Sequence, residues 1–193
     1  SKKHESIVKE FYHRVKASND IYMGVQKGWY CVGCEEFKEN PENLPNYKCP
    51  IHKKNLEWRN EDNLFFRLSK YQSQIESLIN NPSFIEPKER RNEIINFVLK
   101  GLKDFSISRT NVSWGISVPD TKNHTFYVWF DALLGYVSAI SQDIKNPSLD
   151  DSINKGWPAD IHLIGKDILR FHAIYWPAML LSAGMKLPKK VFG

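Results

Sequence analysis

The three cysteines of the chain and one histidine form two pairs of potential metal ligands. Two residues separate Cys31 from Cys34 and Cys49 from His52, and fourteen residues lie between the two pairs. Three thiolates and an imidazole at this spacing complete a tetrahedral site, which favours Zn²⁺. The spacing therefore predicts a zinc knuckle over about residues 28–58, and the zinc is expected to be structural because no open coordination position with a nearby general base is evident. The alternative is three unrelated thiols and a surface histidine.

Aromatic residues recur at helical spacing in two later stretches. Each stretch follows a strongly apolar run, and its members are Trp129, Ala132, Leu133 and Tyr136 in the first and Ile164, Ile168, Phe171, His172, Tyr175 and Trp176 in the second. Such stripes are usually core packing. His172 lies on the apolar stripe, however, and Pro177 falls inside the predicted helix, where it removes a backbone hydrogen bond. Local departures of this kind often mark a ligand site, so a pocket is the alternative interpretation.

Gly165, Lys166 and Asp167 stand at the end of a predicted strand. Ligands bind at the carboxyl ends of strands in open α/β sheets, and glycine allows close approach of the backbone. Asp167 is either a hydrogen-bond acceptor for a ribose or a helix N-cap, and Asp131 has the same N-cap alternative. Arg109 follows another short strand, and a surface position is favoured for it over an active-site role.

Strands followed by helices in the second half of the chain indicate an α/β fold. Helices are predicted over residues 1–18, 64–80 and 87–101. A polar loop is expected over 143–158. Two buried strands, 125–130 and 161–164, are each expected to lead into a helix, the first over about 132–142 and the second ending near residue 184.

Composition is that of a globular protein with one domain or one domain and an insert. The 193 residues are 41% hydrophobic and 25% charged, with a net charge of +5 that permits a nucleic-acid partner without requiring one. No apolar run approaches the ~20 residues of a membrane span, and the polar N-terminus predicts no signal peptide. An odd number of cysteines favours a reducing compartment.

Several stretches, in order, resemble methionyl-tRNA synthetases, which are class I aminoacyl-tRNA synthetases. They are residues 28–34 (Gly-Trp-Tyr-Cys-Val-Gly-Cys), 63–71, 107–110, 128–136 (Val-Trp-Phe-Asp-Ala-Leu-Leu-Gly-Tyr) and 162–172, continuing through 176–180. The resemblance covers nearly the whole chain from about residue 20. It implies the second half of a Rossmann-type parallel-sheet catalytic domain over 106–193, and a connective insertion with the zinc knuckle and a helical stem over 1–105.

The resemblance also implies an activity, methionine–tRNA ligase, in which methionine and ATP form methionyl-adenylate and the acyl group passes to tRNA(Met). ATP would act with Mg²⁺, the zinc would be structural, and no membrane is involved. The residues that match the family's methionine pocket are Trp129, Ala132, Leu133, Tyr136, Ile168, Phe171, His172 and Trp176. Ile164, Gly165 and Asp167 match its adenosine-binding segment, and some members carry proline where this chain has Leu133.

The family's HIGH and KMSKS motifs do not occur in the sequence, so no catalytic residue is assigned and these 193 residues alone are expected to be inactive. A cytoplasmic location is expected, although organellar members share the same motifs. Two alternatives are a non-catalytic zinc-knuckle module that binds RNA, for which exposed Lys88, Arg90 and Arg91 are candidates, and a class I synthetase for another apolar amino acid.

Overall fold

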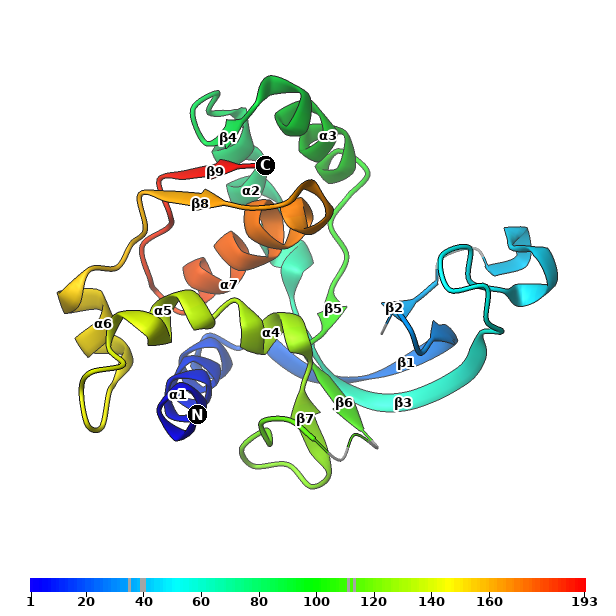
Figure 1. Cartoon of the computed structure of the whole chain (residues 1–193), viewed down its shortest axis with the longest axis horizontal. Helices are drawn as coiled ribbons and strands as arrows, with labels where there is room; N and C mark the ends of the chain where they lie inside the picture. Colours follow the sequence, from blue (N-terminus) through cyan, green and yellow to red (C-terminus); the bar gives the residue numbers. More distant parts are fainter. Residues whose placement is uncertain (35, 39–40, 111, 113) are drawn as a thin grey trace.

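The computed structural model describes residues 1–34, 36–38, 41–110, 112 and 114–193. Helices and strands alternate irregularly along the chain (Figure 1). The strands are β1 (Ile21–Cys31), β2 (Glu36–Phe37), β3 (Glu57–Phe66), β4 (Ile85–Glu86), β5 (Phe105–Ser106), β6 (Ser108–Thr110), β7 (His124–Phe126), β8 (Ile161–Leu163) and β9 (Lys190–Phe192). The α-helices are α1 (Lys2–Ala17), α2 (Gln72–Asn80), α3 (Lys88–Val98), α4 (Val128–Ala132), α5 (Gly135–Ile140), α6 (Leu149–Lys155) and α7 (Trp176–Ser182).

The two longest strands form a hairpin that projects from the helical body (Figure 1). β1 and β3 pair antiparallel from Ile21↔Phe66 to Tyr30↔Glu57. The short strands β2 and β5 extend this sheet to the order β2-β1-β3-β5. The loop-rich segment between β1 and β3 lies at the far end of the hairpin, and it contains short 3₁₀ turns at Pro41–Asn43 and Pro45–Tyr47.

Three short strands form a parallel sheet in the order β4-β9-β8, which confirms the predicted α/β class. The middle residue of β8, His162, is only 3% exposed, whereas its neighbours Ile161 and Leu163 are 56% and 78% exposed. One face of β8 is therefore covered and the other is open. The prediction of a fully buried strand is wrong here, because side chains alternate between the two faces of a strand.

Residues 125–130 do not form the predicted buried strand. β7 ends at Phe126 and pairs antiparallel with β6, and helix α4 begins at Val128. The helix turns Phe130 into the core, where its ring stacks 4.9 Å from Phe126 and lies 5.8 Å from Phe11 of α1. This packing outweighs the β propensity of the aromatic run, which is a context-dependent preference.

The long helix predicted after β8 is broken into different turn types. A 3₁₀ turn covers Lys166–Ile168, a π-helical turn covers Phe171–Tyr175, and α7 follows. The backbone N–H of Trp176 donates to the carbonyl of Phe171, five residues back. Pro177, which has no N–H to donate, follows directly at the start of α7. Single π turns inside helices frequently occur at functional sites.

The other helices partly follow the sequence patterns. α1 and α3 confirm the helices predicted over 1–18 and 87–101. The helix predicted over 64–80 begins later, since residues 64–66 belong to β3 and Leu68–Tyr71 form a 3₁₀ turn before α2. The stretch 143–158, predicted to be a loop, contains α6, which begins with a reciprocal pair of hydrogen bonds between Ser148 and Asp151.

One hydrophobic core joins the N-terminal helix to the C-terminal half of the chain. Phe11 of α1 and Trp176 of α7 are fully buried, with ring centroids 5.9 Å apart. The same cluster includes residues of α2, α3, α4 and α5. No helix in the described part of the chain has both the length and the hydropathy of a membrane span.

Candidate metal centre and aromatic site

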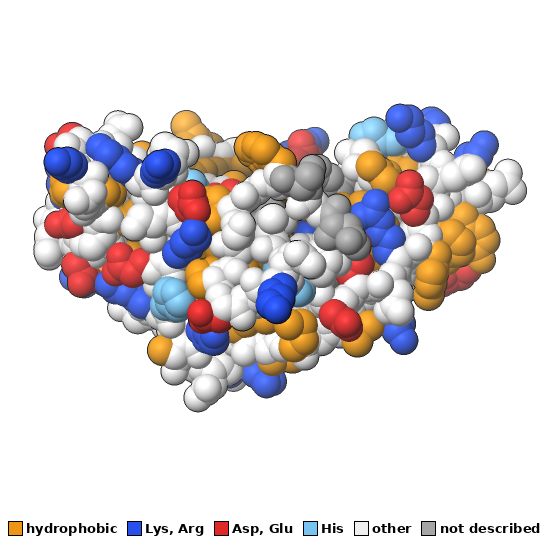
Figure 2. All heavy atoms as spheres, turned by 90° about the horizontal axis from the view of Figure 1, so that it is seen from below, with side chains coloured by type: hydrophobic (Ala, Val, Ile, Leu, Met, Phe, Trp, Pro, Cys, Tyr) orange, Lys and Arg blue, Asp and Glu red, His pale blue; other side chains and the backbone are white. Residues whose placement is uncertain are grey.

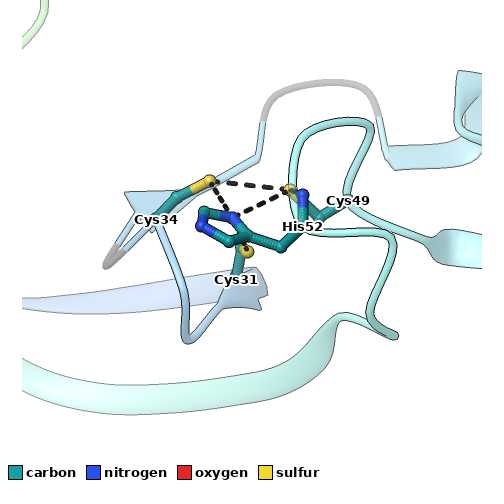
Figure 3. A group of neighbouring side chains, drawn as sticks. All are labelled: Cys31, Cys34, Cys49 and His52. Carbon is teal, nitrogen blue, oxygen red and sulfur yellow. Dashed lines mark hydrogen bonds between the residues drawn. The ribbon is translucent and has the colours of Figure 1, made fainter.

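The four predicted metal ligands come together at the far end of the hairpin. Cys31 ends β1, Cys34 lies in the turn that follows, and Cys49 and His52 lie in the loop before β3. Figure 3 shows the four side chains pointing toward one another from these two segments. Their candidate ligand atoms all lie within 4.8 Å of one another. We refer to these four residues as the Cys₃His cluster.

Distances within the Cys₃His cluster fit a single tetrahedral ion. The Nδ1 atom of His52 lies 3.8, 3.3 and 3.8 Å from the sulfurs of Cys31, Cys34 and Cys49, and the Cys34 and Cys49 sulfurs are 3.5 Å apart. Metal–sulfur bonds of about 2.3 Å in a tetrahedron place neighbouring ligand atoms about 3.6–3.8 Å apart. The residues present therefore fit a zinc ion.

The backbone around the cluster supports this arrangement. The His52 N–H donates to the Cys49 sulfur over 3.5 Å, and this contact is the main reason that the pKa of Cys49 is lowered to about 6. A Cβ atom on Gly33 would lie 2.8 Å from the His52 ring, so only glycine fits there without displacing the imidazole. Cys31, Cys49 and Leu56 form a small buried cluster of their own.

A second group of side chains, the aromatic cluster, is assembled from five elements. It consists of Trp129 (α4), Tyr136 (α5), His162 (β8), Phe171 and His172 (the π turn) and Trp176 (α7). The rings of Trp129 and Phe171 stack at 3.9 Å. The ring of Tyr136 lies 4.4 Å from His162 and 5.6 Å from His172.

Hydrogen bonds fix the protonation pattern of the aromatic cluster. His172 Nδ1 lies 2.9 Å from the carbonyl of Ile168, which can only accept, so this nitrogen carries the proton. In the neutral imidazole, Nε2 is then an acceptor, and the Tyr136 hydroxyl donates to it over 2.9 Å. Trp176 Nε1 donates to His162 Nε2 over 3.3 Å, since an indole N–H can only donate.

Burial keeps both imidazoles of the cluster neutral. It lowers the pKa of His162 to about 4, with a smaller contribution from the charge that His172 would carry. Burial also lowers the pKa of His172, partly offset by its hydrogen bond to the Ile168 carbonyl. Burial raises the pKa of Tyr136, so the hydroxyl keeps its proton at neutral pH.

The residues predicted to form the pocket differ in exposure. His172, Trp176 and Leu133 are buried, and Leu133 belongs to the hydrophobic core. Trp129, Phe171 and Ile168 are half-buried. Tyr136 is 39% exposed and Ala132 is exposed, so these two residues face solvent.

The segment after β8 follows directly from the sheet. The N–H of Ile164 donates to the carbonyl of Phe192 in β9, and Gly165 begins the 3₁₀ turn. Gly165 and Asp167 are exposed. Because Asp167 lies within the turn rather than before it, the N-cap interpretation of Asp167 is wrong.

Asp131 is not an N-cap either, because it lies inside α4 and binds the N-terminal helix. His4 Nε2 lies 2.5 Å from a carboxylate oxygen of Asp131, and His4 Nδ1 lies 2.7 Å from the hydroxyl of Ser138. These contacts tie α1 to α4 and α5, the helices that carry Trp129 and Tyr136. The sequence patterns give no indication of this link, since His4 is 127 residues from Asp131.

Asp20 anchors the hairpin to the helical body. Its fully buried carboxylate accepts hydrogen bonds from Lys70 (2.6 Å), Tyr71 (2.5 Å) and Ser182 of α7 (2.7 Å). Burial raises the pKa of Asp20, but these hydrogen bonds outweigh it and leave the pKa lowered. The base of β1 is thereby fixed to α7, the helix that begins at Trp176.

Arg109 is half-buried, so the favoured surface interpretation is wrong. Its guanidinium donates to the Ser106 hydroxyl and the Ser108 carbonyl, each over 2.9 Å, and lies 4.1 Å from the centre of the Tyr127 ring. Its buried Nε has no hydrogen-bond partner among the residues that the structure describes.

His162 is the member of the aromatic cluster that the sequence patterns missed. Its signal was present in the sequence, because it is the one polar residue in the apolar run 161–164. A polar side chain on the covered face of a strand needs a partner, and Trp176 is the partner here.

A family model described as tRNA synthetases class I (M) matches residues 38–193. The chain belongs to this family. The match takes in the whole aromatic cluster and two of the four residues of the Cys₃His cluster, Cys49 and His52. It confirms the resemblance on which the predicted site residues rest.

Relatives in the class I (M) family are similar to this chain over nearly all of it. The methionine–tRNA ligase of Nostoc sp. is 60% identical, with 99% of this chain and 36% of the relative aligned. The chloroplastic/mitochondrial methionine–tRNA ligase of Arabidopsis thaliana is 57% identical over 99% of this chain and 31% of its own length. The chain thus spans about a third of the length of these relatives.

The fold is that of solved structures in the class I (M) family. The methionyl-tRNA synthetase of Mycobacterium tuberculosis bound by methionyl-adenylate matches all of this chain with a TM-score of 0.88 and 41% identity, and the match covers 38% of that structure. The free form of the same enzyme matches 98% of this chain with a TM-score of 0.86.

Proposed function

We propose that this chain supplies the methionine-binding part of the catalytic core of a methionine–tRNA ligase. The observation that carries the proposal is the hydrogen bond between Tyr136 and His172 beside the stacked rings of Trp129 and Phe171. This arrangement occurs in a chain that belongs to the class I (M) family. The reaction would join methionine to ATP as an adenylate and then transfer the acyl group to tRNA(Met).

Methionine suits the aromatic cluster chemically. Its thioether is apolar, flexible and polarizable, and sulfur packs favourably against aromatic edges. Tyr136 and His172 would offer polar atoms near the sulfur of the substrate methionine. The rest of its side chain would be surrounded by Trp129, Ala132, Leu133, Ile168, Phe171 and Trp176. Purely apolar pockets separate similar aliphatic side chains by only ~1–3 kcal/mol, so the polar pair would supply selectivity against leucine and isoleucine.

ATP would bind at the segment that follows β8. Ile164 and Gly165 leave the backbone accessible to the adenosine, and the exposed carboxylate of Asp167 is available to a ribose hydroxyl. Formation of the adenylate would be catalysed by positioning of the two substrates and stabilisation of the phosphate charge rather than by a nucleophilic side chain. Mg²⁺ would accompany ATP, and its chemistry is the neutralisation of phosphate charge.

Zinc would be held by Cys31, Cys34, Cys49 and His52 and would have a structural role. All four ligands come from the protein, which leaves no position for a substrate. We assign residues 1–105 to the connective insertion with its helical stem and residues 106–193 to the second half of the catalytic domain. Without the HIGH and KMSKS motifs, this segment by itself would form no adenylate.

The RNA-binding alternative has less support. Within residues 28–58 there are four basic and five acidic residues, so the knuckle region offers no excess of positive charge for phosphates. Figure 2 likewise shows basic and acidic side chains interspersed on the face that it presents. Arg90 pairs with Glu93, and Arg91 donates to the carbonyls of Ile79 and Asn80, so both have structural partners.

The test is amino-acid-dependent exchange of pyrophosphate into ATP by the full-length protein that carries this sequence. Exchange should require methionine and should not occur with leucine, isoleucine, valine or cysteine. The 193 residues alone should give none. Exchange driven by a different amino acid, or no exchange with any of them, would refute the proposal. We expect the reaction in the cytoplasm, or in an organelle as the name of the Arabidopsis relative states for that protein.

A further inference from the structure

We propose that His162 is a positioning residue of the methionine site, which holds the Tyr136 ring and the Trp176 indole in their binding orientation. This inference rests on the proposed function. It assigns to His162 a role in substrate affinity through Tyr136 and Trp176, with no contact to the reacting atoms.

His162 occupies the one inward-facing position of β8. Its side chain is 3% exposed between two exposed neighbours, and it faces α7 and the π turn. Burying an imidazole is unfavourable unless it is hydrogen-bonded, and an apolar residue would fill a plain core position without that cost. The polar atom at this position therefore has a specific use.

The contacts of His162 reach both sides of the aromatic cluster. Its Nε2 accepts the hydrogen bond of Trp176, which fixes the plane of the indole. Its ring lies against Tyr136, at 4.4 Å and a tilt of 44°, and limits the space in which the phenol ring can turn. Trp157 closes the other side, 5.7 Å from Trp176 and 6.2 Å from His162.

Holding Tyr136 also fixes the direction of its hydroxyl group. The hydrogen atom points to His172 Nε2, because His172 Nδ1 already donates to Ile168. The Tyr136 oxygen then keeps lone pairs that can accept a hydrogen bond. A phenol ring that is free to turn would break this hydrogen bond and leave the buried His172 Nε2 without its donor.

The experiment compares variants at position 162 in the full-length protein. His162→Leu removes both the acceptor and the flat ring. His162→Phe keeps a ring and removes the acceptor. His162→Gln places an oxygen close to the Nε2 position and can accept from Trp176. His124→Gln is the matched control, because His124 is a strand histidine bonded to Ser108, over 3.1 Å, on β7.

We expect His162→Leu to raise the KM for methionine about tenfold, equivalent to ~1.4 kcal/mol, while the KM for ATP changes less than about twofold. His162→Phe should raise it in the same direction, and His162→Gln should restore it to within about threefold of the original. His124→Gln should leave both constants unchanged.

A purely structural role would give a different result. Folded Leu and Phe variants with a lower melting temperature but an unchanged KM for methionine would overturn the inference, as would equal increases in both KM values. If the Leu variant does not fold, the Phe and Gln variants decide the question by the same criterion. Absence of methionine-dependent exchange in the unmodified protein would refute the proposed function instead.

Discussion

The Cys₃His cluster and the aromatic cluster are built in opposite ways. The four candidate metal ligands lie within 22 positions of the sequence, in two short turns at the end of the hairpin. The six residues of the aromatic cluster come from five elements between residues 129 and 176, and they lie on a core that also contains α1. The first cluster depends on local spacing, whereas the second depends on how helices and strands pack.

The difference shows which features hold each region in place. A metal ion would hold the knuckle together, since the buried hydrophobic cluster of the knuckle is small and, among the described residues, contains Cys31, Cys49 and Leu56. The aromatic cluster is held by core packing and by links from distant residues, such as His4 to Asp131. Damage to one region should therefore leave the other intact, except where Asp20 joins the hairpin to the body.

The largest effect is expected for Cys49→Ser, which removes a buried sulfur ligand. Zinc bound per chain should fall from one to near zero in elemental analysis, because two thiolates and one imidazole leave the tetrahedral ligand set of a structural zinc site incomplete. Hydrogen exchange should accelerate over about residues 28–58 only. Ser6→Ala is the control on the helical body, and unchanged zinc content in the Cys49 variant would contradict the assignment.

Asp20→Ala should be the most destabilising change outside the metal centre. It leaves the buried hydroxyls of Tyr71 and Ser182 without their shared acceptor, at a cost of ~1–3 kcal/mol each, whereas the half-exposed Lys70 can turn to water. Chemical denaturation measures this loss. Asp160→Ala removes an exposed ion pair with Lys189 and should cost less than ~1 kcal/mol. Equal losses of unfolding free energy in the two variants would show that the hydrogen bonds to Asp20 stabilise the protein no more than an exposed ion pair does.

Acid should weaken the aromatic cluster through His162. Its pKa is about 4 when folded, against 6.5 ordinarily, so between these values the unfolded chain binds a proton that the folded chain does not. The free energy of unfolding should fall as the pH drops from 6.5 to 4, by up to ~3 kcal/mol from this residue. The difference between the original protein and His162→Gln isolates the effect, and parallel pH curves would exclude it.

Tyr136→Phe tests the polar pair of the aromatic cluster. Without the hydroxyl, His172 Nε2 loses its donor, and an unsatisfied buried acceptor costs ~1–3 kcal/mol. The KM for methionine should rise about tenfold in pyrophosphate exchange, with zinc content unchanged. Tyr47→Phe, at an exposed position within the knuckle, is the control. An equal KM for methionine in the two variants would show that Tyr136 does not belong to the methionine site.

Gly33→Ala should have the smallest effect, confined to the Cys₃His cluster. The added methyl group would lie 2.8 Å from the His52 ring and push the imidazole off its position. Zinc affinity, measured by competition with a chelator, should weaken about tenfold, or ~1.4 kcal/mol. Gly101→Asn is the control, since no atom of the described residues lies within 4 Å of a Cβ there and its φ of +88° suits asparagine better than alanine. Unchanged affinity in the Gly33 variant would show that the histidine can shift freely.

Much of the molecule could be predicted from local patterns. The Cys₃His cluster followed from ligand type and spacing, and α1 and α3 followed from apolar periodicity. The prediction of a strand over the aromatic run 125–130 was wrong because helix and strand preferences compete there. The contact of Phe130 with Phe11 favours the helix. The roles of Asp131 and Asp167 were ambiguous because an N-cap can be identified only when the first residue of the helix is known. The sequence did not fix where these helical turns begin.

The sequence by itself determined the candidate metal-ligand set, the α/β class and the residues of the aromatic stripes, because each of these depends on residue type and short-range spacing. Tertiary structure decided which of those residues meet. It brought His162 between Tyr136 and Trp176, placed His4 on Asp131, and buried Asp20 beneath α7. Such pairs are separated by up to 162 positions, and only the packing of the common core brings them within hydrogen-bonding distance.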